Sequence, residues 1–220
     1  MAGEHLKVYR LIRRQASDFR LPSVTEISAE EDPYLVLVSC ILSLRTKDSV
    51  ALRASRRLFK EASDPRSMLR LPEKKISGLI FPVGFYRTKA GVILGASRAI
   101  LESFGGRVPC TIEDLLSIKG VGRKTANLVL GLGYGIPAVC VDTHVHRISN
   151  RLGWVKSVKA EETEKALQGL FARRYWIELN TVLVAFGQNI CRPVSPFCGR
   201  CAAERCCPKA GAAESGRGRK

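Results

Sequence analysis

Four cysteines crowd into a window of seventeen residues near the C-terminal end of the chain, and they restrict what this segment can fold into. Their separations are six, two and five residues, and they are Cys191, Cys198, Cys201 and Cys207. Pro193, Pro196 and Gly199 interrupt regular structure between them, as a loop that wraps one centre requires. Four thiolates can serve a tetrahedral zinc ion or a [4Fe-4S] cluster, and the spacing alone does not choose between the two.

The chain has eight cysteines in all, and the other four carry separate expectations. Cys206 directly precedes the last of the four above, so on the residues alone either thiol could be the fourth ligand. Cys40, Cys110 and Cys140 sit in apolar surroundings and are predicted to be buried thiols. Residues 1–15 contain no apolar core of signal-peptide length, so we expect an intracellular protein, in which disulfides are rare.

The hydrophobic periodicity is helical almost throughout, and strand-like alternation is nearly absent, so we predict an all-α fold. The segment 34–44 is apolar on every side, which is typical of a central helix that is packed all round. A helix that starts at Asp48 should bury Val50, Ala54 and Leu58. Further helices are predicted over 65–69, 72–80, 86–104, 111–118, 141–152, 160–171 and 176–190.

The chain carries a large excess of positive charge. Its 36 Lys and Arg residues against 20 Asp and Glu residues give a formal charge of +16, which indicates a polyanionic partner, with nucleic acid the first expectation. The alternative is a merely basic, soluble protein. Residues 209–220 are predicted to be disordered and hold only four of the basic residues. The most apolar stretch, 125–141, is broken by glycines and falls short of the roughly 20 residues of a membrane span, so no membrane partner is expected.

The segment Lys119–Lys124 lies between two predicted helices and has the pattern of a helix-hairpin-helix. Gly120 and Gly122 permit positive φ and a close approach of the backbone, so amides at the start of the second helix can point at a phosphate. Such a clamp binds the DNA backbone without reading its sequence. The alternative is an ordinary glycine turn between two packed helices.

Lys124 and Asp142 are the candidate catalytic residues. Lys124 lies in the first turn of that second helix, where the helix dipole and Arg123 favour a neutral, nucleophilic amine. Asp142 is predicted to be the N-cap of the next helical stretch. A phosphate-contacting lysine and a purely structural cap are the alternatives.

Together these features resemble endonuclease III, the bifunctional DNA glycosylase and abasic-site lyase of base-excision repair. The resemblance covers about residues 20–208 and has three marks. They are Leu-x-x-Ile-Lys-Gly-Val-Gly-Arg-Lys-Thr-Ala at 115–126, Val-Asp-Thr-His at 141–144, and the cysteine spacing. By this resemblance the centre is a [4Fe-4S] cluster and not zinc, and its fourth ligand is Cys207 and not Cys206.

The resemblance also implies an architecture and a partner. It implies a six-helix barrel over 26–136 that contains the helix-hairpin-helix, and an iron-sulfur domain made of 1–25 and 137–208. The protein would be a monomer that binds double-stranded DNA with a damaged base or an abasic site. The DNA would lie in the cleft between the domains, with Lys124 and Asp142 at its mouth. The implied location is DNA-associated, in the cytoplasm or nucleoid if the source is bacterial.

The implied reaction removes oxidised pyrimidines from duplex DNA. Lys124 would attack C1′ of a flipped-out nucleotide, displace the base and form an imine, after which β-elimination breaks the strand. Asp142 would deprotonate the nucleophile or stabilise the developing cationic sugar. The cluster would be structural. The residues implied to contact DNA include Gly120, Val121, Gly122 and His144.

Two loops are expected to fill the space that the flipped base leaves. Phe85 stands where the family often has a leucine wedge, and an aromatic ring can stack or insert there, whereas an ordinary core phenylalanine is the alternative. Arg45 occupies a place where many members have glutamine. An arginine can still hydrogen-bond the widowed base, but this departure leaves the lesion preference open. Ile118-Lys119 replaces the commoner Leu-Pro before the hairpin glycine and adds a positive charge near Lys124.

Two other functions fit parts of the sequence. One is a monofunctional mismatch or adenine glycosylase of the same superfamily, whose members usually lack a lysine at the place of Lys124. The other is a catalytically silent DNA-binding protein in which the cluster is a redox sensor or a structural staple. Borohydride trapping separates the three, because only an imine-forming enzyme becomes covalently attached to its DNA.

Overall fold

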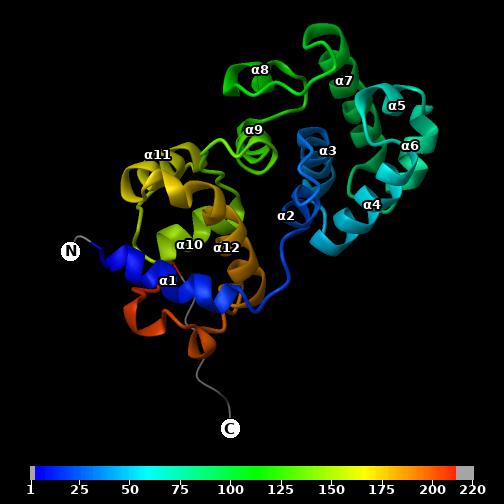
Figure 1. Ribbon diagram of the computed structural model, residues 1–220. Helices are drawn as coiled ribbons and strands as arrows, with labels where there is room; N and C mark the ends of the chain where they lie inside the picture. The colour runs from blue at the N-terminus through cyan, green and yellow to red at the C-terminus, as the bar shows by residue number, and fades with distance from the viewer. Residues whose placement is uncertain (1–2, 212–220) are drawn as a thin grey trace. The chain divides into compact units, whose positions relative to one another are not determined.

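The computed structural model describes residues 3–211, and the chain divides into two compact units. We call Pro22–Ala138 the hairpin unit, and Met1–Leu21 together with Val139–Lys220 the cysteine unit. The regular elements assigned within 3–211 are all helices, with no strand, which confirms the predicted all-α fold (Figure 1). Most of the tail that was predicted to be disordered, residues 212–220, lies outside the described residues.

Helix α3, Pro33–Ser43, is the centre of the hairpin unit. Every residue from Tyr34 to Leu42 is buried, as predicted for a segment that is apolar on every side. The Asp32 carboxylate begins the helix by accepting hydrogen bonds from two amides of its first turn. Around α3 pack α2 (Ser23–Ser28), which was not predicted, α4 (Asp48–Glu61), α7 (Tyr86–Ser103) and α9 (Arg123–Leu128).

Helix α4 begins at Asp48 as predicted, but the side that faces the core is different. The buried side chains are Ala51, Leu52, Ala54, Ser55 and Leu58. Val50 is only partly buried, so its prediction is wrong. Positions spaced four apart drift around a helix of 3.6 residues per turn, so Val50 and Leu58 lie on different sides of the buried stripe.

Short helices complete the hairpin unit. They are α5 (Pro65–Leu69), α6 (Glu73–Ile80), α8 (Ile112–Ser117) and the π-helix η1 (Val129–Gly133). The side chains of Asp64 and Thr111 accept hydrogen bonds from amides of the first turns of α5 and α8, which fixes where these helices begin.

The cysteines outside the four-residue window differ in exposure. Cys40 and Cys140 are buried, as predicted. Cys110 is exposed, so its prediction is wrong. It lies in the irregular connection between α7 and α8, where Val108 and Pro109 fill the inward side.

Helix α12, Trp176–Asn189, is the core helix of the cysteine unit. It packs against α1 (Glu4–Ala16) and α10 (Thr143–Arg151), and α10 also contacts α11 (Ala160–Leu170). Tyr9 of α1 anchors this core, with its ring edge-to-face against Phe171 and Tyr175 at 5.5 and 5.6 Å between centroids. The 3-10 turns are η2 (Arg173–Tyr175), η3 (Cys198–Arg200) and η4 (Glu204–Cys206). Among the described helices, none is both long and apolar enough to cross a bilayer.

Candidate functional site

The turn between α8 and α9 carries the glycine-rich segment of the hairpin. Gly120 has a φ of +91°, and a β-carbon there would lie 2.6 Å from Val92 Cγ1, so the position requires glycine. Gly122 has extended backbone with a φ of −97°, so it does not use the positive φ that a glycine permits. One left-handed residue is enough to reverse the chain here. Beyond the chain neighbours of Gly122, no described atom lies within 4 Å of a β-carbon built on it, so this position is open to a ligand.

Val121 anchors the turn between these two glycines. Its side chain is 6% exposed, and its amide donates to the carbonyl oxygen of Ile118 at 3.0 Å. Gly120 and Gly122 are both exposed. The three hairpin residues predicted to contact DNA therefore divide into two that present backbone surface and one that holds them in place.

Lys124 is the second residue of α9 and is half-buried. It lies close enough to Cys40 of α3 for its positive charge to lower the pKa of that thiol, which offsets part of the increase that burial causes. Burial raises the pKa of Cys40 to about 12. This thiol therefore keeps its proton at neutral pH.

Asp142 is the N-cap of α10, as predicted. Its Oδ1 accepts hydrogen bonds from the amides of His144 at 2.9 Å and Val145 at 2.8 Å. Two bonds to backbone fix the orientation of the carboxylate. Both use the same oxygen, so Oδ2 is not needed for capping.

His144 packs into a gap in α12. Gly187 has no side chain, and a β-carbon there would lie 2.5 Å from His144 Nδ1. The Arg147 Nη2 lies 3.1 Å from the same ring nitrogen and donates to the carbonyl oxygen of Cys191 at 2.8 Å. Because a guanidinium only donates, Nδ1 is the acceptor. His144 is thus half-buried, and Arg147, which the sequence did not single out, joins it to the first cysteine of the window.

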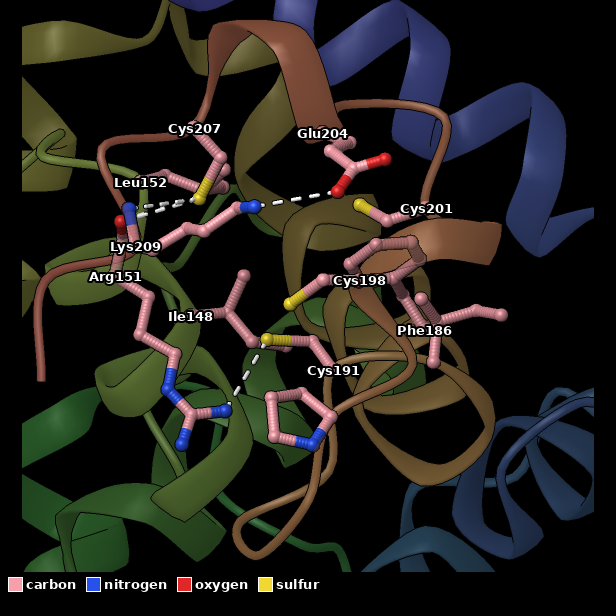
Figure 2. A pocket seen from close by; sticks show the side chains of 12 residues that line it. Ile148, Arg151, Leu152, Phe186, Cys191, Cys198, Cys201, Glu204, Cys207 and Lys209 are labelled. Atoms are coloured by element: carbon pink, nitrogen blue, oxygen red, sulfur yellow. Dashed lines mark hydrogen bonds and ion pairs between the residues drawn. The ribbon is translucent and has the colours of Figure 1, made fainter. Parts of the chain in front are cut away.

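The four cysteines of the window line one hollow in the cysteine unit (Figure 2). We call this the cysteine hollow; its sulfur atoms belong to Cys191, Cys198, Cys201 and Cys207. Apolar side chains from α10 and α12, among them Ile148 and Phe186, line the same space. Cys206 is exposed and is not part of the lining. The fold therefore brings together the four thiols that the family resemblance selects.

The spacing of these thiols bears on the kind of centre that they suit. Among residues 3–211, no group of three or more His, Cys, Asp or Glu side chains is placed to hold one metal ion. A zinc ion draws four sulfurs to about 2.3 Å from a single point. A [4Fe-4S] cluster is bound at four separate iron atoms, so its thiolates stand further apart. Four thiols around one hollow provide the donor set that either centre uses.

Burial changes the acidity of two of these thiols. It raises the pKa of Cys201 to about 11 and also raises the pKa of Cys207. By itself the hollow therefore favours neutral thiols. A positively charged centre would reverse this preference, because metal ligation requires the thiolate.

Arg151 of α10 fixes the start of the cysteine loop, although the sequence did not single it out. It is 6% exposed and donates to the carbonyl oxygens of Arg192 at 2.6 Å and Pro193 at 2.9 Å. It also donates to Cys191 Sγ at 3.4 Å. The carbonyl oxygen of Arg151 accepts from Cys207 Sγ at 3.3 Å. One residue of α10 thus contacts the first cysteine through its guanidinium, which places a positive charge beside Cys191 Sγ, and the last cysteine through its carbonyl oxygen.

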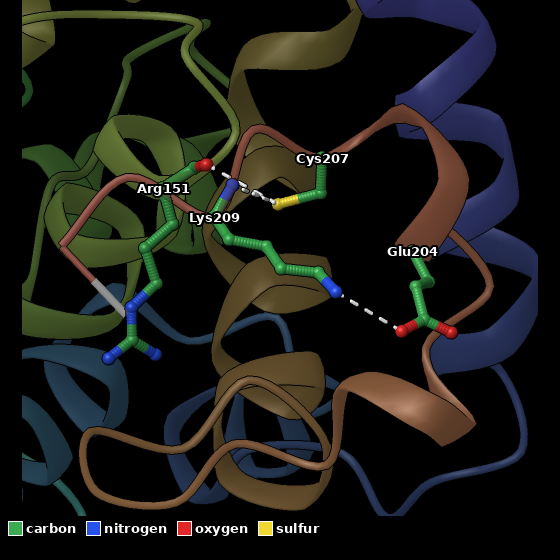
Figure 3. A network of polar contacts seen from close by, with 4 residues as sticks. All are labelled: Arg151, Glu204, Cys207 and Lys209. Atoms are coloured by element: carbon green, nitrogen blue, oxygen red, sulfur yellow. Dashed lines mark hydrogen bonds and ion pairs between the residues drawn. The ribbon is translucent and has the colours of Figure 1, made fainter. Parts of the chain in front are cut away.

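Lys209 closes the far side of the cysteine hollow (Figure 3). Its amide donates to Cys207 Sγ at 3.3 Å, and its Nζ pairs with the Glu204 carboxylate at 3.2 Å. This ion pair is exposed, so we expect it to add little to stability. The amide of Lys209 thus donates to the sulfur of the last cysteine, whose thiol donates to the Arg151 carbonyl oxygen.

Arg45 and Phe85 come together on the hairpin unit, from the loops that precede α4 and α7. The Arg45 Cζ lies 5.7 Å from the centroid of the Phe85 ring, a cation–π arrangement. Phe85 is 63% exposed, so the alternative that it is a core phenylalanine is wrong. Both residues have left-handed backbone, with φ of 49° and 57°. The two predicted loop residues therefore form one exposed feature.

The sequence matches the family model described as HhH-GPD superfamily base excision DNA repair protein over residues 38–173. It is 48% identical over 172 residues to endonuclease III of Thermotoga maritima, across 78% of this chain and 81% of that protein. The chain spans about half the length of two chloroplastic endonuclease III homologs of Arabidopsis thaliana.

Two solved structures have the same fold. A non-covalent endonuclease III–DNA complex matches with a TM-score of 0.82 and 28% identity, over 95% of this chain and 97% of that chain. A trapped endonuclease III–DNA covalent intermediate matches with a TM-score of 0.77 and 31% identity, over 81% of this chain and 84% of that chain. The chain belongs to the endonuclease III family of the HhH-GPD superfamily of base excision DNA repair proteins.

Proposed function

We propose that this DNA glycosylase removes oxidised pyrimidines from double-stranded DNA and cleaves the resulting abasic site as a lyase. The observation that carries the proposal is the position of Lys124, in the first turn of the helix that follows the exposed Gly122. Backbone that holds a phosphate at the hairpin would keep this amine beside the sugars of the bound strand. A lysine, unlike an activated water, gives a covalent intermediate, so it implies both activities.

Lys124 acts as the nucleophile in this scheme. The target nucleotide leaves the base stack, at a cost that a damaged, poorly stacked base reduces. The Lys124 Nζ then attacks C1′, the bond from C1′ to the base breaks, and the base leaves. The departing base takes one proton from the amine, and O4′ takes the other as the C1′–O4′ bond breaks, which leaves an imine between Nζ and C1′.

The imine makes the C2′ proton acidic and sets up strand cleavage. Loss of that proton pushes out the 3′ phosphate, so the C3′–O bond breaks by β-elimination. Water then hydrolyses the imine and frees Lys124. The reaction consumes one water overall and needs no external oxidant or reductant.

Asp142 is proposed to assist the first step. Its carboxylate either accepts a proton from the attacking amine or stabilises the positive charge that develops on the sugar. The cap to the amides of His144 and Val145 supports this role, because it fixes the carboxylate before substrate binds. His144 itself is proposed to contact the DNA.

The cofactor is proposed to be a [4Fe-4S] cluster held by Cys191, Cys198, Cys201 and Cys207. When bound it supplies a structural cross-link and the positive iron that keeps four thiolates deprotonated. The position of all four thiols around the one cysteine hollow supports this assignment. The Arg151 guanidinium would offset the negative charge of the Cys191 thiolate.

Sodium borohydride trapping tests the reaction. The probes are duplexes with thymine glycol or an abasic site, at protein concentrations that saturate binding. We expect a covalent adduct with the unmodified chain and with Lys119→Ala, which removes an exposed lysine of the same hairpin. Lys124→Ala should bind DNA and give no adduct.

Each other outcome has a distinct meaning. An adduct that persists in pure Lys124→Ala would remove Lys124 from its role. Base release without any adduct would indicate a monofunctional glycosylase. If neither base release nor an adduct is seen on any lesion, the chain is a catalytically silent DNA-binding protein in which the cluster is a structural cross-link.

A further inference from the structure

Lys89 of helix α7 is 7% exposed, and the proposed reaction does not use it. Lysine is almost never buried so fully unless its charge is paired. The Lys89 Nζ donates to the carbonyl oxygen of Leu42 at 2.9 Å, to that of Leu44, and to the Thr46 hydroxyl at 3.1 Å. An ammonium has three N–H donors, and residues 42–46, which are the end of α3 and the loop that follows it, accept all of them.

The acceptors of Lys89 lie where α3 ends. The last carbonyls of a helix have no partner within it, and a cation is favoured there by the helix dipole. Burial nevertheless lowers the pKa of Lys89 to about 8, which shows that the charged form is held at a cost.

The Thr46 hydroxyl joins this loop to a second one. It accepts from the amide of Gly84 at 3.1 Å as well as from Lys89, and it donates to the carbonyl oxygen of Leu44 at 3.1 Å. Its single donor and both acceptor positions are therefore in use. A β-carbon on Gly84 would lie 2.5 Å from the carbonyl oxygen of Arg45, so the two backbones are in direct contact.

These two loops, residues 42–46 and 81–85, carry an exposed apolar surface. Leu44 is 36% exposed, Phe81 58% and Phe85 63%. Arg45 stacks on Phe85, and both have left-handed backbone, which is unfavourable for a residue with a side chain. Strain of this kind persists only where surrounding contacts impose it. The hydrogen bonds of Lys89 and Thr46 are contacts of that kind.

We propose that Lys89 is a positioning residue that locks loops 42–46 and 81–85 into one preformed wedge, with Arg45 and Phe85 set to replace a flipped-out nucleotide. This inference rests on the proposed function. Because such a wedge is already ordered in the free protein, DNA binding does not have to supply the entropy cost of ordering it. Its benefit should therefore appear where a base pair must be opened, and not in the chemistry at Lys124.

Single-turnover rates on two substrates test this role. The first is thymine glycol paired with adenine, which must be flipped out of a duplex. The second is an abasic site in a one-nucleotide bulge, which has no partner to replace. The variants are Lys89→Met, which keeps the length of the stem, and Thr46→Val, which keeps the shape of the side chain. Lys74→Met, at an exposed position of α6, is the control for a lost charge.

We expect Lys89→Met to act about 100-fold more slowly on the paired lesion, the effect of a wedge misplaced by about 1 Å. Thr46→Val should change the rate in the same direction, and both variants should stay within about threefold of the unmodified chain on the bulge. Lys74→Met should match the unmodified chain on both substrates. Thr46→Val keeps the test valid if Lys89→Met does not fold.

Trypsin supplies a readout that needs no DNA. Cleavage after Arg45 in the free protein should be faster in Lys89→Met and Thr46→Val, because each releases loop 42–46, while cleavage elsewhere stays unchanged. Equal losses on the paired and bulged substrates, or unchanged rates on both, would overturn the positioning role. An unmodified chain that is inactive on both substrates would instead overturn the proposed function.

Discussion

Asp142 combines a structural task with a proposed chemical one, and a single substitution separates them. Asparagine caps a helix about as well as aspartate, so Asp142→Asn should keep the two bonds to α10 and change the free energy of unfolding by less than about 0.5 kcal/mol. It lacks the negative charge, so the rate of adduct formation should fall about 10²- to 10⁴-fold. Chemical denaturation and borohydride trapping measure the two effects on the same preparation.

The matched control is Asp142→Ala, which removes the cap as well as the charge. It should lose about 1 kcal/mol of stability and at least as much activity as the asparagine variant. Full activity in Asp142→Asn would show that Asp142 is a cap and nothing more.

Lys89 gives the hairpin unit a pH-dependent stability with a definite sign. Its pKa is about 8 in the folded state, against about 10.4 in an unfolded chain. Below pH 8 both states hold the proton, and the cost of burying the charge is fully present. Between about pH 8 and 10.4 the unfolded state holds more protons, so the folded state gains stability as the pH rises.

The measurement is the difference in unfolding free energy between the unmodified chain and Lys89→Met, taken by denaturation from pH 7 to 10. The difference should move in favour of the unmodified chain as the pH rises. The charged side chains of Arg45, Lys47 and Arg87 lie on the same segments. They are present in both proteins, so their effect on the unfolding free energy cancels in the difference. A difference that is flat over this range would show that Lys89 is not desolvated.

At the scale of elements, the hairpin predicts opposite results for its two glycines. Gly120→Ala meets both a positive φ and the Val92 side chain, so it should destabilise the chain by more than about 1 kcal/mol. Gly122→Ala meets neither, and its stability should stay within about 0.5 kcal/mol of the unmodified chain. The added methyl group would still stand where a phosphate is proposed to approach, so DNA binding should weaken. Denaturation curves and fluorescence anisotropy with labelled duplex check the pair; unchanged binding by Gly122→Ala would place the phosphate elsewhere.

Helix starts were predictable from sequence because their signals are local. The side chains of Asp32, Asp64, Thr111 and Asp142 bind amides two or three residues along the chain. The cysteine window could also be identified from the sequence, because its four thiols lie close together along the chain. Exposure at Val50 and Cys110 depended on tertiary packing, and it was predicted incorrectly.

The burial of two cationic side chains could not be predicted from the sequence. Lys89 lies in a helix, where a lysine usually faces solvent, and its acceptors are 43 to 47 residues away. Arg151 is similar, because it meets Cys191 40 residues further along. Periodicity reports which face of a helix is apolar, but it does not report which charge is enclosed when distant loops close over it.

For the whole molecule, the net charge of +16 predicts steeply salt-dependent binding to DNA. Each phosphate that a Lys or Arg neutralises releases counterions, so affinity should fall roughly 10³- to 10⁵-fold between about 50 and 200 mM salt if about six to ten phosphates are engaged. Anisotropy titrations over a salt series give the slope. Lys119→Ala should reduce that slope by about one if the hairpin lysine contacts a phosphate. A nearly flat response would mean that the charge of the chain is not gathered where DNA binds, and that apolar contacts such as those of Phe85 supply most of the affinity.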